Sequence, residues 1–107
     1  MINIGNVSEA IAREIKLLSE KIENDLAHKE DYIRYKTLLN ESGIGDDLIK
    51  NKLSKYDIDN VEDYYKKRRE NRDDSFFEGA VLGVLLGLGL SILFLWALQQ
   101  EKTSKNK

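Results

Sequence analysis

The sequence predicts an all-α protein, in which a polar helical segment is followed by a single transmembrane helix. Residues 79–98 contain no charged side chain, and the 107-residue chain contains no proline, a residue that interrupts helices. Before residue 79, apolar residues recur at intervals of three and four, which is the period of an α-helix. We expect a long N-terminal amphipathic, coiled-coil-like helix, two shorter helices and the C-terminal span.

Residues 79–98 are predicted to cross a membrane. At about 1.5 Å per residue, a helix of this length is ~30 Å long, which matches the hydrocarbon core of a bilayer. Twelve of its residues are Leu, Ile, Val or Phe, and together they favour insertion by about 4 to 7 kcal/mol. Trp96 lies near the far end, where its ring suits the headgroup level. The alternative, a buried core helix, needs a larger surrounding domain than 107 residues supply.

Small residues recur at regular intervals within the predicted span. Gly79, Gly83, Gly87 and Ser91 follow one another every four residues, so they share one helix face. In lipid, such a row lets two helix backbones approach closely, and this packing drives helix association. We therefore predict that the row packs against another helix, in a homo-oligomer or in a partner protein. Gly89 lies on the opposite face and is available for a second contact.

The first helix is predicted to run from about residue 7 to residue 41. Asn6 and Glu9 have the spacing of a capping box at its start. Asp25 and Lys29 interrupt its heptad register. A helix of this length would be ~52 Å long, too long for a compact segment of this size, so it serves a coiled coil or a helix hairpin. Its apolar stripe is predicted to pack in the cytoplasm, and consists of Ile11, Ile15, Leu18, Ile22 and Leu26.

Two turns divide the rest of the polar segment. Residues 42–46 form the clearest break, and a short helix follows to about residue 56. Residues 57–60 form the second turn, and the next helix is expected to continue into the span. The chain is thus divided into a cytoplasmic helical segment (1–75), a transmembrane helix (76–98) and a short polar external tail (99–107). A small apolar cluster is expected from Ile44, Leu48, Leu53, Ile58, Val61 and Tyr65.

The charge distribution predicts the orientation of the span. Three basic residues follow the span, and five precede it closely, namely Lys66, Lys67, Arg68, Arg69 and Arg72. Basic residues are retained on the cytoplasmic side, where each gains about 1 kcal/mol from anionic headgroups. We therefore assign these five residues to topology and to lipid contact. The N-terminus has no basic region followed by an apolar run, so no secretory signal is expected. Abundant Ile, Lys and Asn indicate an AT-rich genome, such as that of a low-GC bacterium or its phage. We therefore expect the membrane to be a bacterial plasma or inner membrane.

The sequence offers no recognisable catalytic, cofactor or metal site. There is no cysteine, and the one histidine, His28, has only Asp25 and Asp31 at helical spacing, whereas a metal site needs three or four converging ligands. No Ser-His-Asp or Cys-His set can be assembled. We therefore expect a non-enzymatic protein without a cofactor.

Three functions are compatible with this organisation. The favoured one is a single-pass membrane anchor that self-associates or docks a protein partner at the cytoplasmic face. A small pore former, such as a holin-like protein, is the alternative, but a water-filled pore needs a polar face and Ser91 is the only polar side chain in residues 79–98. A membrane-tethered helix-turn-helix DNA binder is disfavoured, because residues 1–75 carry 14 basic and 17 acidic side chains, the wrong balance for phosphate contacts.

Overall fold

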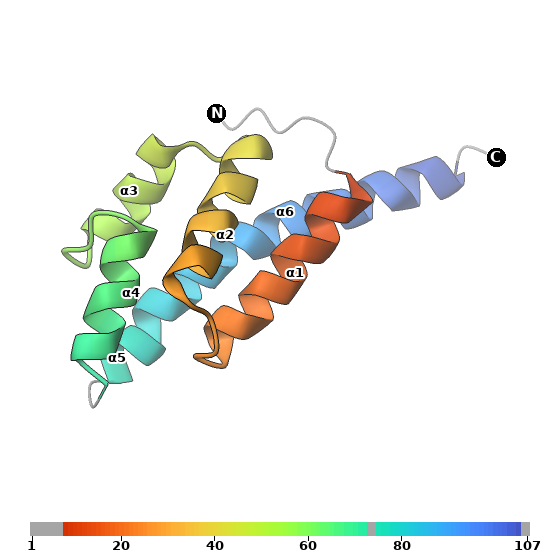
Figure 1. Ribbon diagram of the computed structural model, residues 1–107. Coiled ribbons are helices and arrows are strands. Elements are labelled where there is room, and N and C mark those ends of the chain that lie inside the picture. Colours follow the sequence, from red (N-terminus) through yellow and green to blue (C-terminus); the bar gives the residue numbers. More distant parts are fainter. Residues whose placement is uncertain (1–7, 73–74, 106–107) are drawn as a thin grey trace.

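The computed structural model describes residues 8–72 and 75–105, with side chains as far as residue 100. These residues form helices and no strand, so the predicted all-α class is confirmed for them. The molecule is elongated, with principal extents of 52 × 27 × 21 Å. Its elements are α1 (Glu9–Glu23), α2 (Lys29–Glu41), α3 (Asp46–Ser54), α4 (Val61–Glu70), α5 (Ser75–Glu78) and α6 (Ala80–Lys105) (Figure 1).

The predicted long N-terminal helix is divided into α1 and α2. Residues 24–28 reverse the chain, and Asp25 takes a left-handed backbone conformation (φ 59°) that aspartate tolerates better than most residues. The backbone N–H of His28 donates to the Asp31 carboxylate at 2.9 Å and so starts α2. The register interruption in the sequence therefore marks a helix hairpin, and the described residues contain no long coiled-coil helix.

Local capping explains where the other short helices begin. The Ser8 side chain accepts from the Ile11 amide at 3.1 Å at the start of α1, whereas the predicted cap Asn6 lies outside the described residues. The Asn60 side chain accepts from the Asp63 amide at 2.8 Å at the start of α4. Gly43, with φ 105°, provides the turn between α2 and α3.

The helix after the second turn does not continue into the apolar helix, as the sequence suggested. α4 ends at Glu70, and its C-cap Asn71 has a non-helical backbone. The separate short helix α5 then precedes α6, and the turn at Gly79 lies between them. The chain therefore changes direction before the apolar helix begins.

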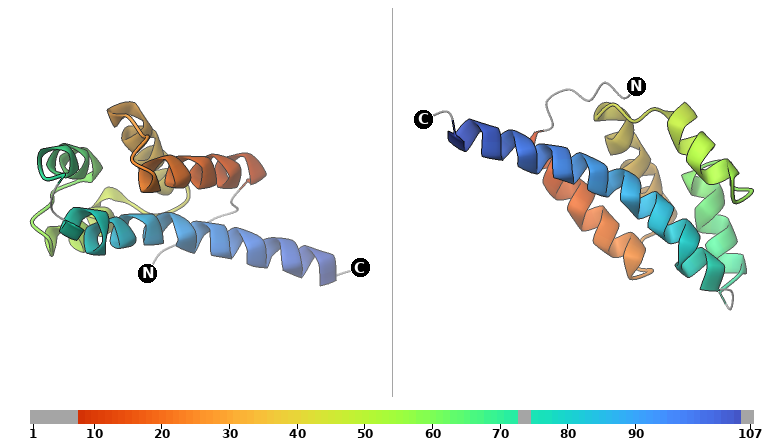
Figure 2. Two further views of the ribbon diagram at one scale, coloured as in Figure 1. Left: turned by 90° about the horizontal axis from the view of Figure 1, so that it is seen from below. Right: turned by 180° about the vertical axis from the view of Figure 1, so that it is seen from behind.

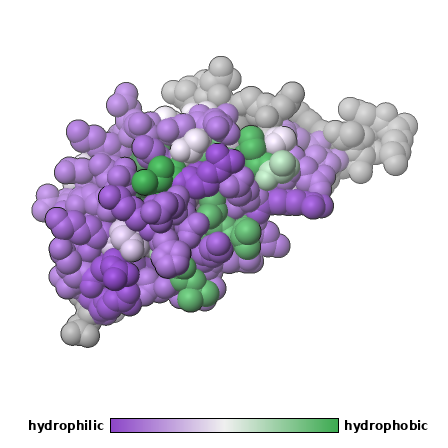
Figure 3. Space-filling view, viewed as in Figure 1, coloured by the Kyte–Doolittle hydropathy of each residue, from purple (hydrophilic) through white to green (hydrophobic). Residues whose placement is uncertain are grey.

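The helices preceding α6 cover only one of its sides. α1 lies along α6 and runs in the opposite direction, while α3 and α4 lie near the start of α6 (Figure 1). Figure 2 shows that the far end of α6 extends beyond the other helices. The surface of α1–α4 that faces away from α6 is mostly hydrophilic (Figure 3). The polar segment is thus an amphipathic layer whose apolar side rests on α6.

One continuous core joins this layer to α6. The small apolar cluster predicted for residues 44–65 is present in the layer. Leu48 and Tyr65 are partly buried, and its other members are fully buried, namely Ile44, Leu53, Ile58 and Val61. The core residues from α6 are Val81, Leu82, Leu85, Leu88 and Ile92. The core residues from the layer are Ala12, Ile15, Leu18, Ile22, Ala27, Tyr32, Tyr35, Leu38, Leu39, Ile44, Ile49, Leu53, Ile58, Val61 and Tyr64.

Candidate functional site: the two faces of the apolar helix and the polar cluster at its start

Among the described residues, one helix is long and apolar enough to cross a membrane. The candidate span is Ser75–Gln100, and a third of its most apolar window is buried against the rest of the chain. Length and composition alone do not separate a membrane span from the core helix of a soluble protein. The two faces of this helix differ in what covers them.

The inner face of α6 is shaped to receive one side chain from α2. The Tyr35 hydroxyl donates to the Leu85 carbonyl at 2.9 Å and accepts from the Gly89 amide at 3.0 Å. These two backbone groups are four residues apart, so the hydroxyl lies within the hydrogen-bond ladder of the helix. A Cβ atom at position 89 would lie 2.3 Å from the Tyr35 hydroxyl oxygen, so only glycine fits. In this structure Tyr35 of the same chain therefore occupies the side of Gly89 that the sequence suggested for a contact with a second helix.

The Tyr35 hydroxyl remains a neutral donor in this contact. Burial raises the pKa of Tyr35 to about 12, because removal from water disfavours the phenolate. The Gly89 amide acts in the opposite direction but is outweighed. The side chain is fully buried, so this polar contact is made entirely inside the core.

A cluster of polar side chains around Arg68 holds the start of the apolar helix. Arg68 is 2 % exposed and forms a two-pronged ion pair with Glu78, at 3.0 Å from Nε and 2.5 Å from Nη2. Its Nη1 donates to the Ile22 carbonyl at 2.6 Å and to the Tyr32 hydroxyl at 3.1 Å. The Asp25 carboxylate lies 3.7 Å from Nε. One guanidinium of α4 therefore connects the end of α1, the start of α2 and the end of α5.

The surroundings of Arg68 keep its charge. Burial lowers the pKa of Arg68, but the hydrogen bonds to Glu78 and Tyr32 outweigh this effect and raise the pKa above its ordinary value. Burial also raises the pKa of Tyr32 and of Tyr64, so both phenols stay neutral beside the guanidinium. The guanidinium is buried whereas the Glu78 side chain is 38 % exposed, so it is the removal of Glu78 that leaves an uncompensated buried charge, which is costly.

Two further polar contacts fix the same region. The Tyr64 hydroxyl donates to the Phe77 carbonyl at 2.6 Å, which attaches α5 to α4. The exposed guanidinium of Arg72 bonds to the Asp25 carboxylate at 2.7 Å, which attaches the end of α4 to the α1–α2 turn. Together with the Arg68 cluster, these contacts set the position at which the apolar helix leaves the layer.

The outer face of α6 is left open by the rest of the chain. It consists of exposed residues without a charge, namely Ala80, Gly83, Gly87, Leu90, Ser91, Phe94, Ala97 and Leu98. Leu90 and Phe94 are 59 % and 64 % exposed. A Cβ atom added at Gly83 or Gly87 would meet nothing within 4 Å. All four residues of the predicted small-residue row are exposed on this side, and only at Gly79 would an added Cβ atom meet a neighbour, the Ser75 carbonyl oxygen at 3.1 Å.

The apolar stripe of the first helix packs mainly within the chain itself, against α6 and α2. Ile15, Leu18 and Ile22 are buried in the core, and Ile11 packs at its edge. Leu26 is 68 % exposed, so its predicted packing role is wrong. The reason is the chain reversal at residues 24–28, which removes Leu26 from the face that α1 presents to α6.

The predicted basic cluster is divided between surface and core. Lys66, Arg69 and Arg72 are exposed, whereas Lys67 is half-buried and forms an ion pair with Asp63 at 3.2 Å. Arg68 is buried in the polar cluster, so in this structure it is not accessible to lipid headgroups. Val61, Tyr64 and Arg68 share one buried face of α4, but their spacing alone does not indicate which elements cover that face.

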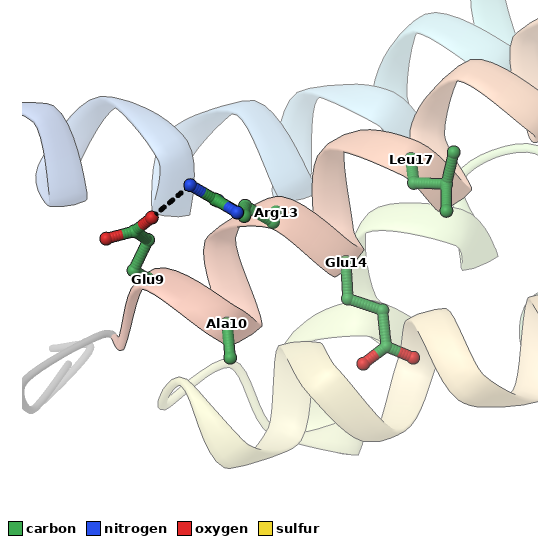
Figure 4. Close-up of a pocket in the computed structure, with 5 residues that line it drawn as sticks. All are labelled: Glu9, Ala10, Arg13, Glu14 and Leu17. Atoms are coloured by element: carbon green, nitrogen blue, oxygen red, sulfur yellow. Dashed lines mark ion pairs between the residues drawn. The ribbon is translucent and has the colours of Figure 1, made fainter.

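The surface of α1 carries a shallow open pocket. Figure 4 shows its lining on one side of the helix: Glu9, Ala10, Arg13, Glu14 and Leu17. Its charged groups are paired, Glu9 with Arg13 and Glu14 with Arg34. Within the described part of the chain, no group of three or more His, Cys, Asp or Glu residues is arranged to hold a metal ion.

Comparisons of the chain with protein-family models, with curated proteins and with solved structures find no match. Its function is therefore inferred from geometry. Sequence reasoning missed two features: the hydrogen bonds of the Tyr35 hydroxyl with the backbone of α6, and the ion pair between Arg68 and Glu78. Both join segments far apart in the sequence, which local periodicity does not reveal.

Proposed function

We propose that the protein is a non-enzymatic, single-pass membrane anchor. In this proposal α6 crosses the bilayer, the helical layer α1–α4 lies at the cytoplasmic face of a bacterial plasma or inner membrane, and the protein self-associates or docks a protein partner there. The observation that carries the proposal is the outer face of α6, which is uncharged and uncovered along the helix to Leu98.

The open face argues against a role for α6 as a soluble core helix. A core helix is covered on all sides, whereas Leu90 and Phe94 are both more than half exposed. A continuous exposed apolar surface in a folded protein is typical of a site of contact with a membrane or another protein. Lipid is the occupant that fits a whole helix of this length and composition.

Brominated lipids provide the direct test of membrane insertion. Trp96 is the only tryptophan of the chain and lies on α6, so its fluorescence reports the position of this helix. With vesicles that contain anionic lipid, we expect bromine on the acyl chains to quench Trp96. Vesicles without bromine provide the control. Unquenched fluorescence at saturating lipid would refute the anchor.

The orientation follows from the exposed basic residues before the span. Lys66, Arg69 and Arg72 lie on the surface of the helical segment, where cytoplasmic headgroups favour them. In intact cells, a cysteine introduced at position 104 should react with a membrane-impermeant reagent added from outside. Reaction only after lysis would overturn this topology.

Self-association is assigned to the small-residue row of the outer face. Gly83 and Gly87 leave open space beside the backbone, as close helix contact requires. Replacing both with leucine should weaken association in detergent, and an unchanged oligomer size would exclude this row as the contact.

The pore alternative predicts rapid depolarisation of cells on expression, whereas the anchor predicts none.

A further inference from the structure

We infer that α6 exchanges between two mutually exclusive coverings: the apolar side of the helical layer, as in this structure, and the bilayer. This inference rests on the proposed membrane function. In the docked form, α1, α2 and α3 pack against the inner face of α6. In the inserted form, lipid replaces them, so insertion requires the layer to release the helix.

The extent of the docked surface excludes insertion without release. The buried inner-face residues reach from Val81 to Ile92, which is about 17 Å along the helix and more than half of a hydrocarbon core. α1 lies beside this stretch in the opposite direction (Figure 2). Its other side carries the exposed charges of Arg13, Lys16 and Glu20. These charges would have to enter the hydrocarbon together with α6, which the bilayer strongly disfavours.

The docked form is held by contacts that are reversible. Leu85 and Gly89 are four residues apart, so their backbone groups pair with each other in a regular helix when Tyr35 withdraws. Release of the tyrosine therefore leaves no unpaired backbone group on α6 in the bilayer, where such a group would be costly. Gly89 then becomes an ordinary glycine of the span.

The Arg68–Glu78 pair acts as the latch of the docked form. Glu78 is the last residue of α5, immediately before the turn into α6, and its carboxylate is held by the buried guanidinium. Arg68 also binds the carbonyl of Ile22 at the end of α1. Weakening this pair loosens the start of α6 and the end of α1 together, so it favours release.

The absence of native cysteine allows a clean test of release. In the single-cysteine variants Ile15→Cys and Ala12→Cys, the thiol lies on the buried side of α1. We expect a maleimide to label them slowly in water. With acyl-brominated anionic vesicles, labelling should reach the rate of the exposed control Lys16→Cys while Trp96 becomes quenched. Circular dichroism in water verifies that each variant is folded, and the two buried positions check each other.

The latch is tested by one charge-neutralising substitution. Glu78→Gln should lower the lipid concentration for half-maximal Trp96 quenching by about tenfold, because a buried guanidinium loses its charged partner. Glu9→Gln removes an exposed ion pair with Arg13 and should leave that concentration unchanged.

The outcomes separate the inference from the proposed function. Quenching of Trp96 together with labelling of both buried cysteines supports both. Quenching with both cysteines still protected overturns the release inference and leaves the anchor intact. An equal effect of Glu78→Gln and Glu9→Gln overturns the latch. Absence of quenching in every variant refutes the anchor, and the exchange with it.

Discussion

The two faces of α6 differ in how much of their surface the rest of the chain covers. The inner face is covered by the helical layer, and its one glycine, Gly89, provides the space that the Tyr35 hydroxyl occupies. On the outer face, a Cβ atom added at Gly83 or Gly87 would meet nothing within 4 Å, and large side chains such as Phe94 are mostly exposed. A contact with Tyr35 therefore explains the glycine on the inner face, whereas no contact with the described residues explains Gly83 and Gly87 on the outer face.

This difference shows that the outer face has to be explained by something outside the chain. The inner face fits the helical layer through its shape and through buried hydrogen bonds, which are stronger in a protein interior than in water. The outer face offers no polar contact apart from Ser91 and no charge. Lipid makes no directional contacts, so a uniform apolar surface is the one that suits it.

The polar cluster at the start of α6 should show the largest effect. Replacing Arg68 with leucine removes the ion pair with Glu78 and leaves the buried Ile22 carbonyl and Tyr32 hydroxyl without their charged donor, so we expect a loss of about 3 kcal/mol or more in the free energy of unfolding. Urea unfolding followed by circular dichroism measures it. Arg13→Leu removes an exposed ion pair and should cost at most about 1 kcal/mol. Equal losses in the two variants would mean that Arg68 is not the fixed point of the layer.

The same substitution on the two faces should have opposite signs. Gly89→Ala places a Cβ atom 2.3 Å from the Tyr35 hydroxyl oxygen and should destabilise the docked fold by about 1 to 3 kcal/mol. Gly83→Ala meets open space and should stabilise it by about 0.5 to 1 kcal/mol, because alanine restricts the unfolded chain and favours helix. Thermal unfolding of the two variants beside the wild type decides the point, and a common sign would contradict the distinction between the faces.

The contribution of Tyr35 to stability should change from favourable to unfavourable at alkaline pH. At neutral pH, Tyr35→Phe loses two buried hydrogen bonds and should cost about 1 kcal/mol. Its native pKa is about 12, above the ordinary value near 10, so the unfolded state loses its proton first as the pH rises. The wild type therefore loses about 2 to 3 kcal/mol between pH 10 and 12 that the variant keeps. Urea midpoints across this range measure the difference, and a gap that does not change with pH would contradict the docked position of Tyr35.

Local patterns predicted the elements better than their partners. The twenty uncharged residues at 79–98 and the apolar spacing of Ile15, Leu18 and Ile22 were sufficient to predict an apolar helix and an amphipathic one. Periodicity identifies a face but not what covers it, so the packing of α1 on α6 was not predicted. The turn after α1 depends on a left-handed Asp25, a conformation that helix-forming neighbours do not indicate.

The polar part of the candidate site was least accessible to sequence reasoning. Arg68 is one of five basic residues within seven positions, and its burial depends on the phase of α4 against α1 and α5. Tyr35 is one of five tyrosines, and the carbonyl that accepts its hydrogen bond, that of Leu85, lies fifty residues further along the chain. Such contacts are set by the tertiary arrangement, whereas the uncharged outer face follows from the sequence directly.

The most direct test of the account is a matched pair of lysine substitutions at two exposed leucines. Leu90 is 59 % exposed on the outer face of α6, and Leu17 is 53 % exposed on the far side of α1. Both substitutions should leave the urea midpoint nearly unchanged, because neither side chain belongs to the core. In titrations with anionic vesicles followed by Trp96 fluorescence, Leu90→Lys should lower the partition coefficient by about 100-fold or more, and Leu17→Lys should not lower it. Unchanged partitioning of Leu90→Lys, or an equal loss in Leu17→Lys, would contradict a membrane role for the outer face of α6.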